Sequence, residues 1–143
     1  MRVTPIYIVC SPRPRVGKTL VARLLTEYLA LENKRVAAYD INLNEPSLVD
    51  FLPRLTETAS IDDTFGQMQL MDNLIVHDGV PKAIALGFHA FDGFFKMAWE
   101  IGFAKEAERR GVRPIILVIP DRDRTSHRAW ASAKCVACSA STW

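Results

Sequence analysis

Apolar positions along this chain follow two different periods, and together they predict an α/β domain. Apolar runs rich in β-branched residues occur at 3–10, 35–40, 73–81 and 112–119, and each is expected to be a strand of a mostly parallel sheet. Between these runs, apolar residues recur at helical spacing. This alternation is typical of about four or five strands with helices on both faces and a binding site at the carboxyl ends of the strands.

Two segments have the strongest helical periodicity. The first follows the opening strand, and the residues expected to pack on the sheet are Val21, Leu24, Leu25, Tyr28 and Leu29. The second spans 91–110 and ends at Gly111. We also expect a loop with one helical turn at 41–53, a loop with a short helix at 54–63, and a last helix over 124–138.

The segment between the first strand and the first helix has the composition of a phosphate-binding loop. Gly17-Lys18-Thr19 matches the second half of the Walker A motif, in which backbone N–H groups surround the phosphates, the lysine reaches them and the hydroxyl binds Mg²⁺. The helix that begins there adds the positive end of its dipole. The first glycine of the full motif falls at Pro12, so the strict motif fails. The alternative is an ordinary helix N-terminus with a solvated lysine, and the order of strand, loop and helix favours the phosphate loop.

Two of the expected strands end on an aspartate. Asp40 closes the run at 35–40, and Asp78 is followed by turn residues in the run at 73–81, which has the form of a Walker B strand. His77 precedes Asp78 and is expected to point to the opposite face of that strand, as a packed side chain rather than a catalytic base.

Three segments, taken in this order, resemble the deviant-Walker-A P-loop ATPases: 11–19, 40–48 and 75–81. This family includes the ParA and MinD ATPases and the bacterial tyrosine kinases of polysaccharide export, and the resemblance extends from Val3 to about Pro120. It implies Mg-ATP binding with slow hydrolysis linked to dimerisation. Arg13 stands at the position of the signature lysine of the family and would reach across the dimer.

The resemblance also implies a role for each residue of the site. Lys18 would neutralise the β/γ-phosphates, Asp40 and Arg13 would act with it in catalysis, and Mg²⁺ would be held by Thr19 directly and by Asp40 and Asp78 through water. The residues expected around the nucleotide are Arg13, Pro14, Arg15, Val16, Gly17, Lys18, Thr19 and Leu20.

Departures from the family pattern keep other functions open. Asn42 replaces a second aspartate, and an amide is neither an anionic metal partner nor a base. Arg15 replaces a glycine close to the phosphates, where its Cβ would restrict the backbone dihedrals, or where its guanidinium would instead help to hold phosphate. The strand whose loop reads the adenine has no counterpart, so we expect a truncated or degenerate member. One alternative is a non-catalytic module that binds a partner protein, and another is an ATP-dependent ligase similar to dethiobiotin synthetase, whose loop also ends Val-Gly-Lys-Thr.

Composition excludes several classes of function. A chain of 143 residues with 49% hydrophobic residues is expected to fold as a single domain, and a net charge of +2 gives no strong signal for nucleic acid or an anionic membrane. No stretch is long enough to span a bilayer and no charged leader precedes an apolar segment, so we expect a cytoplasmic protein. The odd cysteine count favours free thiols, and Cys135 and Cys138 lack a second pair for a zinc site.

Two further groups of residues have an ordinary structural explanation. Asp121 and Asp123 lie among arginines and are expected to belong to a charged loop. The aromatic residues near the long helix are expected to pack in the core, with a dimer interface as the alternative; they are Phe88, Phe91, Phe94, Phe95 and Trp99.

Overall fold

The computed structural model describes residues 3–42 and 47–124, which form an α/β domain around one parallel sheet. The five strands lie in the order β3-β2-β4-β1-β5, and every neighbouring pair is parallel. The predicted fold class is therefore confirmed. Their bounds are β1 Thr4–Cys10, β2 Ala37–Ile41, β3 Thr56–Thr58, β4 Lys82–Leu86 and β5 Val112–Val118.

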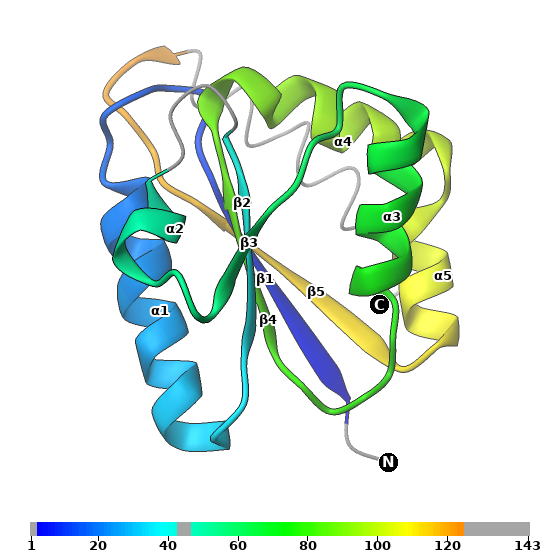
Figure 1. Cartoon of the computed structure of the whole chain (residues 1–143). Helices are drawn as coiled ribbons and strands as arrows, with labels where there is room; N and C mark the ends of the chain where they lie inside the picture. Colours follow the sequence, from blue (N-terminus) through cyan, green and yellow to red (C-terminus); the bar gives the residue numbers. More distant parts are fainter. Residues whose placement is uncertain (1–2, 43–46, 125–143) are drawn as a thin grey trace.

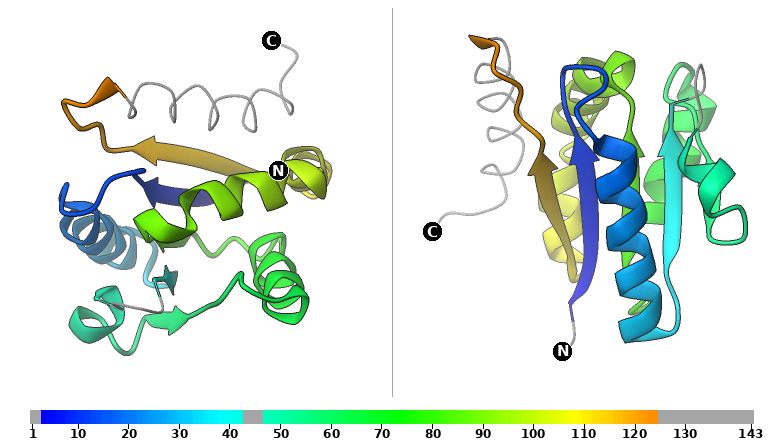
Figure 2. Two further views of the ribbon diagram at one scale, coloured as in Figure 1. Left: turned by 90° about the horizontal axis from the view of Figure 1, so that it is seen from above. Right: turned by 90° about the vertical axis from the view of Figure 1, so that its left-hand side faces the viewer.

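Helices cover both faces of the sheet and make a three-layer domain, seen with the sheet edge-on in Figure 1. One face carries α1 (Lys18–Asn33) and α2 (Leu48–Phe51). The other face carries α3 (Thr64–Leu74), α4 (Phe91–Glu100) and α5 (Phe103–Arg109), and the short 3₁₀ helix η1 (Phe88–Ala90) leads into α4. Figure 2 shows α1 lying lengthwise along its face of the sheet.

The main core lies between the sheet and α3, α4 and α5. Phe91, Phe94 and Phe95 are buried there, and the rings of Phe91 and Phe95 meet edge to face with centroids 4.9 Å apart. Core packing is thus confirmed for these three aromatic residues, whereas Trp99 is exposed. The core on the α1 side is smaller, and its buried members are Val9, Ala22, Ala38, Leu48 and Ala85.

The buried face of α1 differs from the predicted stripe. The buried residues are Ala22, Thr26 and Leu29, while Leu24 and Tyr28 are exposed. The sheet beneath α1 presents the small side chains of Ala38 and Ala85, so a small residue of the helix fits against it better than a large one. The Thr26 hydroxyl is satisfied by donating to the Ala22 carbonyl at 2.7 Å.

The third strand was predicted in the wrong place. Residues 73 and 74 belong to α3, whose buried positions Leu70, Met71 and Leu74 have helical spacing, and the strand begins only at Lys82. Asp78 therefore precedes β4 instead of ending it. The predicted short helix in 54–63 is also wrong, because Thr56–Thr58 forms the edge strand β3; the helical turn predicted within 41–53 is confirmed as α2.

The long helix predicted over 91–110 is two helices. Gly102 lies between α4 and α5 with a φ of 66°, a left-handed conformation that glycine adopts without strain. The predicted stop at Gly111 is confirmed, with a φ of 74°. The last helix predicted over 124–138, including Cys135 and Cys138, lies outside the described residues from Thr125 onward.

Candidate phosphate-binding site

The loop between β1 and α1 lies at the carboxyl edge of the sheet. It spans 11–17 and contains two left-handed residues, Arg15 with a φ of 58° and Gly17 with a φ of 93°. Such conformations turn backbone N–H groups toward one side of a loop, as anion-binding loops require. Arg15 adopts the glycine-like conformation although it has a Cβ, which costs about 1–2 kcal/mol.

Lys18 is the first residue of α1, and its side chain folds back across the loop. Its Nζ donates to the Arg13 carbonyl at 2.8 Å and lies 5.7 Å from the centre of the Phe88 ring. Burial lowers the pKa of Lys18 from its ordinary value of 10.5. No carboxylate within the described ranges pairs with this ammonium group. A partly desolvated cation without a counter-ion favours binding of an anion.

Thr19 and Asp40 are brought together through Ser47. The Thr19 and Ser47 hydroxyl oxygens are 2.8 Å apart, and Asp40 Oδ2 accepts hydrogen bonds from the backbone N–H groups of Ser47 at 3.0 Å and Leu48 at 2.9 Å. Asp40 is 1% exposed, and burial raises its pKa although these hydrogen bonds oppose the rise. Its carboxylate thus serves as the cap at the start of α2.

Asp78 does not reach this site, contrary to the sequence prediction. It forms an ion pair with Lys82 at 3.0 Å, and the N–H of the adjacent Gly79 donates to Thr4 Oγ1 at the start of β1. The phosphate loop leaves the other end of β1, roughly 20 Å away for a strand of this length. The metal role predicted for Asp78 is therefore wrong. His77 is likewise not on a strand; it is exposed and lies against Gly111.

The carboxyl end of β4 presents a glycine where a Walker B strand would present an aspartate. A Cβ at Gly87 would lie 2.8 Å from Cγ of Asn42, so the Asn42 side chain occupies the space beside Gly87. In the described part of the chain, no three His, Cys, Asp or Glu side chains are grouped so that they could hold a metal ion. With Asp40 engaged as a helix cap, these residues do not fit the predicted Mg²⁺ site.

Arg13 is held within its own chain by the turn that follows β5. Its guanidinium forms ion pairs with Asp123 and, at 4.0 Å, with Asp121. The charged loop predicted at 121–124 thus has a specific partner in the phosphate loop. For Arg13 to engage a phosphate of another subunit, these contacts must first open.

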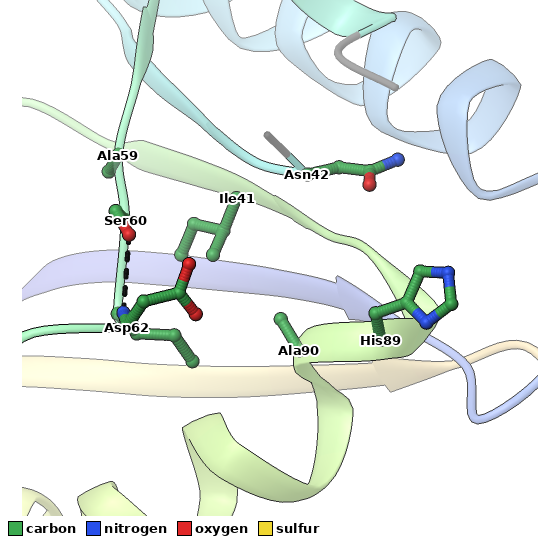
Figure 3. Close-up of a pocket in the computed structure, with 8 residues that line it drawn as sticks. Ile41, Asn42, Ala59, Ser60, Asp62, His89 and Ala90 are labelled. Carbon is green, nitrogen blue, oxygen red and sulfur yellow. Dashed lines mark hydrogen bonds between the residues drawn. The ribbon is translucent and has the colours of Figure 1, made fainter. Parts of the chain in front are cut away.

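A small pocket of about 80 Å³ lies beside the carboxyl ends of β2 and β4. Its polar lining comes from Asn42, Ser60, Asp62 and His89. Figure 3 shows the Asn42 amide and the His89 imidazole on the same side of the pocket, with the Asp62 carboxylate on the opposite side. None of the residues 11–19 is among those that line this pocket, so it is distinct from the phosphate loop.

No family model, curated protein or solved structure matches this chain. Among the helices that the structure describes, none combines the length and the apolar character needed to cross a bilayer.

Two residues that contact the site, Ser47 and Phe88, were not predicted from the sequence to belong to it. Ser47 stands directly before an apolar helical turn, which is a recognised signal for a helix start and could have placed it near Asp40. Phe88 had no comparable signal, because its contact with Lys18 joins residues far apart in the sequence. The residues from Arg13 to Thr19, which were predicted to surround the nucleotide, lie together at the carboxyl edge of the sheet. Leu20 was predicted with them, but its side chain is exposed on α1.

Proposed function

We propose that this chain binds the phosphate groups of a nucleotide, ATP by its resemblance to the ParA and MinD family, at the loop 11–17 and the start of α1. The observation that carries the proposal is the Lys18 ammonium group, which lies over the loop with a carbonyl and an aromatic ring as its neighbours and no counter-ion in the described residues. A phosphate would add the opposite charge that the carbonyl of Arg13 cannot supply, so the ammonium group would gain a counter-ion as well as a hydrogen bond.

The arrangement favours binding without turnover over the slow hydrolysis that the family resemblance implies. Hydrolysis requires a group that orients water or metal near the terminal phosphate. Asp78 lies at the opposite edge of the sheet, Gly87 follows β4, and Asn42 carries an amide. A nucleotide-binding module that acts through a partner or a second copy is therefore the function we propose, and its nucleotide affinity should depend little on Mg²⁺.

Calorimetric titration with ATP, with and without Mg²⁺, tests the proposal. Lys18→Ala should weaken ATP binding by about 2–3 kcal/mol, or roughly 30- to 150-fold, because a hydrogen bond between charged groups is lost. Lys105→Ala is the matched control, since Lys105 is an exposed lysine on α5 that makes no ion pair with the described residues. Equal affinity of the wild type and Lys18→Ala would reject the phosphate-loop assignment.

A further inference from the structure

A second and larger pocket, of about 250 Å³, lies on the other face of the sheet, between α3 and the edge formed by β2 and β3. It is bordered by aromatic, amide and acidic side chains: Tyr39, Glu57, Asp63, Phe65, Gln69 and Asn73. A water molecule takes up about 30 Å³ in the liquid, so the pocket has room for a small organic group.

Tyr39 contributes a hydroxyl that makes no hydrogen bond with the described residues. The residue as a whole is 8% exposed, and the hydroxyl is its accessible part, because it is not among the fully buried side-chain atoms that lack a partner. Burial raises the pKa of Tyr39, and the charges of Glu57 and Asp78 raise it further, which indicates a negative potential at the phenol. The pocket therefore offers an unused polar group in a negative field.

The other polar groups of the pocket add acceptors and negative charge. Glu57, Gln69 and Asn73 make no hydrogen bond or ion pair with the described residues, whereas Asp63 is engaged in accepting from the Gly66 N–H at 2.6 Å. No lysine, arginine or histidine is among the described residues that border the pocket. An anionic ligand would find no cation here, and a cationic donor would find several acceptors.

We propose that this pocket binds an alkylguanidinium group. A guanidinium has five N–H donors in a planar fork that matches a carboxylate such as Glu57, with donors left for the Tyr39 hydroxyl and an amide oxygen. Phe65, which is 77% exposed at the rim, offers a ring face for a cation–π contact. The buried Leu70 provides an apolar wall for the alkyl stem. The site is independent of the phosphate loop, which lies on the other side of β4.

Titration with n-butylguanidinium, followed by calorimetry and by ¹⁵N–¹H spectra, tests this proposal. Shifts of backbone signals should be confined to α3, β3, the loop that joins them and the middle of β2. The neutral n-butylurea, which has the same shape without the charge, should bind at least about tenfold more weakly, because the charge-assisted bonds are lost. Equal binding of the two compounds, or no binding of either, would overturn the proposal.

Variants of the chain separate a specific site from general attraction to negative charge. Glu57→Gln should weaken n-butylguanidinium binding about tenfold, and Asn73→Asp, which adds a carboxylate, should strengthen it. Glu32→Gln is the matched control, because Glu32 is an exposed glutamate on α1, across the sheet. Equal effects of Glu57→Gln and Glu32→Gln would contradict the site.

The source of the guanidinium is decided by a second titration arm. The capped peptide Gly-Arg-Gly carries the same group on a backbone, and the capped peptide Gly-citrulline-Gly is its neutral counterpart. Binding of the arginine peptide as tight as that of n-butylguanidinium would assign an arginine side chain, and binding of the free compound alone would assign a small molecule. Either result supports the site, provided that Glu57→Gln weakens it.

Discussion

Two lysines lie at opposite edges of the same sheet, and they differ in how many hydrogen-bond and ion-pair partners each ammonium group has. Lys82, at the amino edge, is 2% exposed, and its Nζ contacts Asp78 Oδ1 at 3.0 Å and the carbonyl oxygens of Val80 at 3.2 Å and Val76 at 3.4 Å. Lys18, at the carboxyl edge, has one carbonyl partner and a lowered pKa. Removing one partner from a buried and satisfied charge is costly, whereas the half-buried Lys18, without a counter-ion among the described residues, is the group on which the proposed phosphate site depends.

The largest effect is expected from removing the satisfied lysine. Lys82→Met keeps much of the side-chain volume but leaves the Val76 and Val80 carbonyls without their donor, so the free energy of unfolding should fall by about 2–4 kcal/mol. Lys18→Met should change it by less than about 1 kcal/mol and should instead weaken ATP binding by about 2–3 kcal/mol, as expected for Lys18→Ala. Urea unfolding and calorimetry on both variants measure the contrast. Similar losses of stability in the two variants would remove the distinction between the two edges.

The carboxylates at the two edges should respond to pH in opposite directions. Burial raises the pKa of Asp78, but the Lys82 hydrogen bond, the Val80 N–H and the Lys82 charge together lower it below 3.8, whereas burial keeps the pKa of Asp40 above 3.8. The stability that Asp78 contributes is present above pH 3.8 and is lost as the pH falls through its lowered pKa. The ionised form of Asp40 is disfavoured by folding, so its contribution becomes more favourable as the pH falls.

Urea unfolding of the wild type, Asp78→Asn and Asp40→Asn between neutral pH and about pH 3 checks these signs. On acidification, the stability advantage of the wild type over Asp78→Asn should shrink. The stability of the wild type relative to Asp40→Asn should rise over the same range. The same sign for both carboxylates would show that their environments are alike.

The smallest effect is expected from introducing at position 42 the carboxylate that the resemblance to the ParA and MinD ATPases led us to expect there. Asn42→Asp would place a charge beside Gly87, but Asp78 would still be at the other edge of the sheet. Steady-state phosphate release from ATP should therefore stay at the background level in the wild type and in the variant, with binding preserved. Turnover that appears in Asn42→Asp would favour the slow ATPase over the binding module.

The sequence was sufficient for the fold because strand and helix periods alternate clearly around the loop at 11–17. It was insufficient for the site because the position of Asp78 depends on where α3 ends and β4 begins, and an error of a few residues in that boundary moves Asp78 from one edge of the sheet to the other. Leu74 and the two apolar residues after it suit the end of a helix as well as the start of a strand. Only the contacts of Gly79 with Thr4 and of Asp78 with Lys82 decide between them.

The pairing of Arg13 with Asp121 and Asp123 was out of reach for a similar reason. More than a hundred residues separate the partners, and the contact exists only because β5 lies beside β1. Local charge patterns predict a charged loop equally well whether or not such a partner exists. The start of α1, by contrast, was predictable because Gly17-Lys18-Thr19 stands directly between an apolar run and a helical pattern.

The small side chains beneath α1 have a consequence for any ligand at its first turn. Ala22 contacts a surface that includes Ala38 and Ala85, and alanine has no rotamers through which a packing contact can readjust. A shift of α1 over the sheet therefore could not be absorbed by side-chain rearrangement at these contacts. At the phosphate site that we propose, an anion would meet a first helical turn already held against the sheet. Part of the entropy of ordering that site would then be lost during folding, before binding begins.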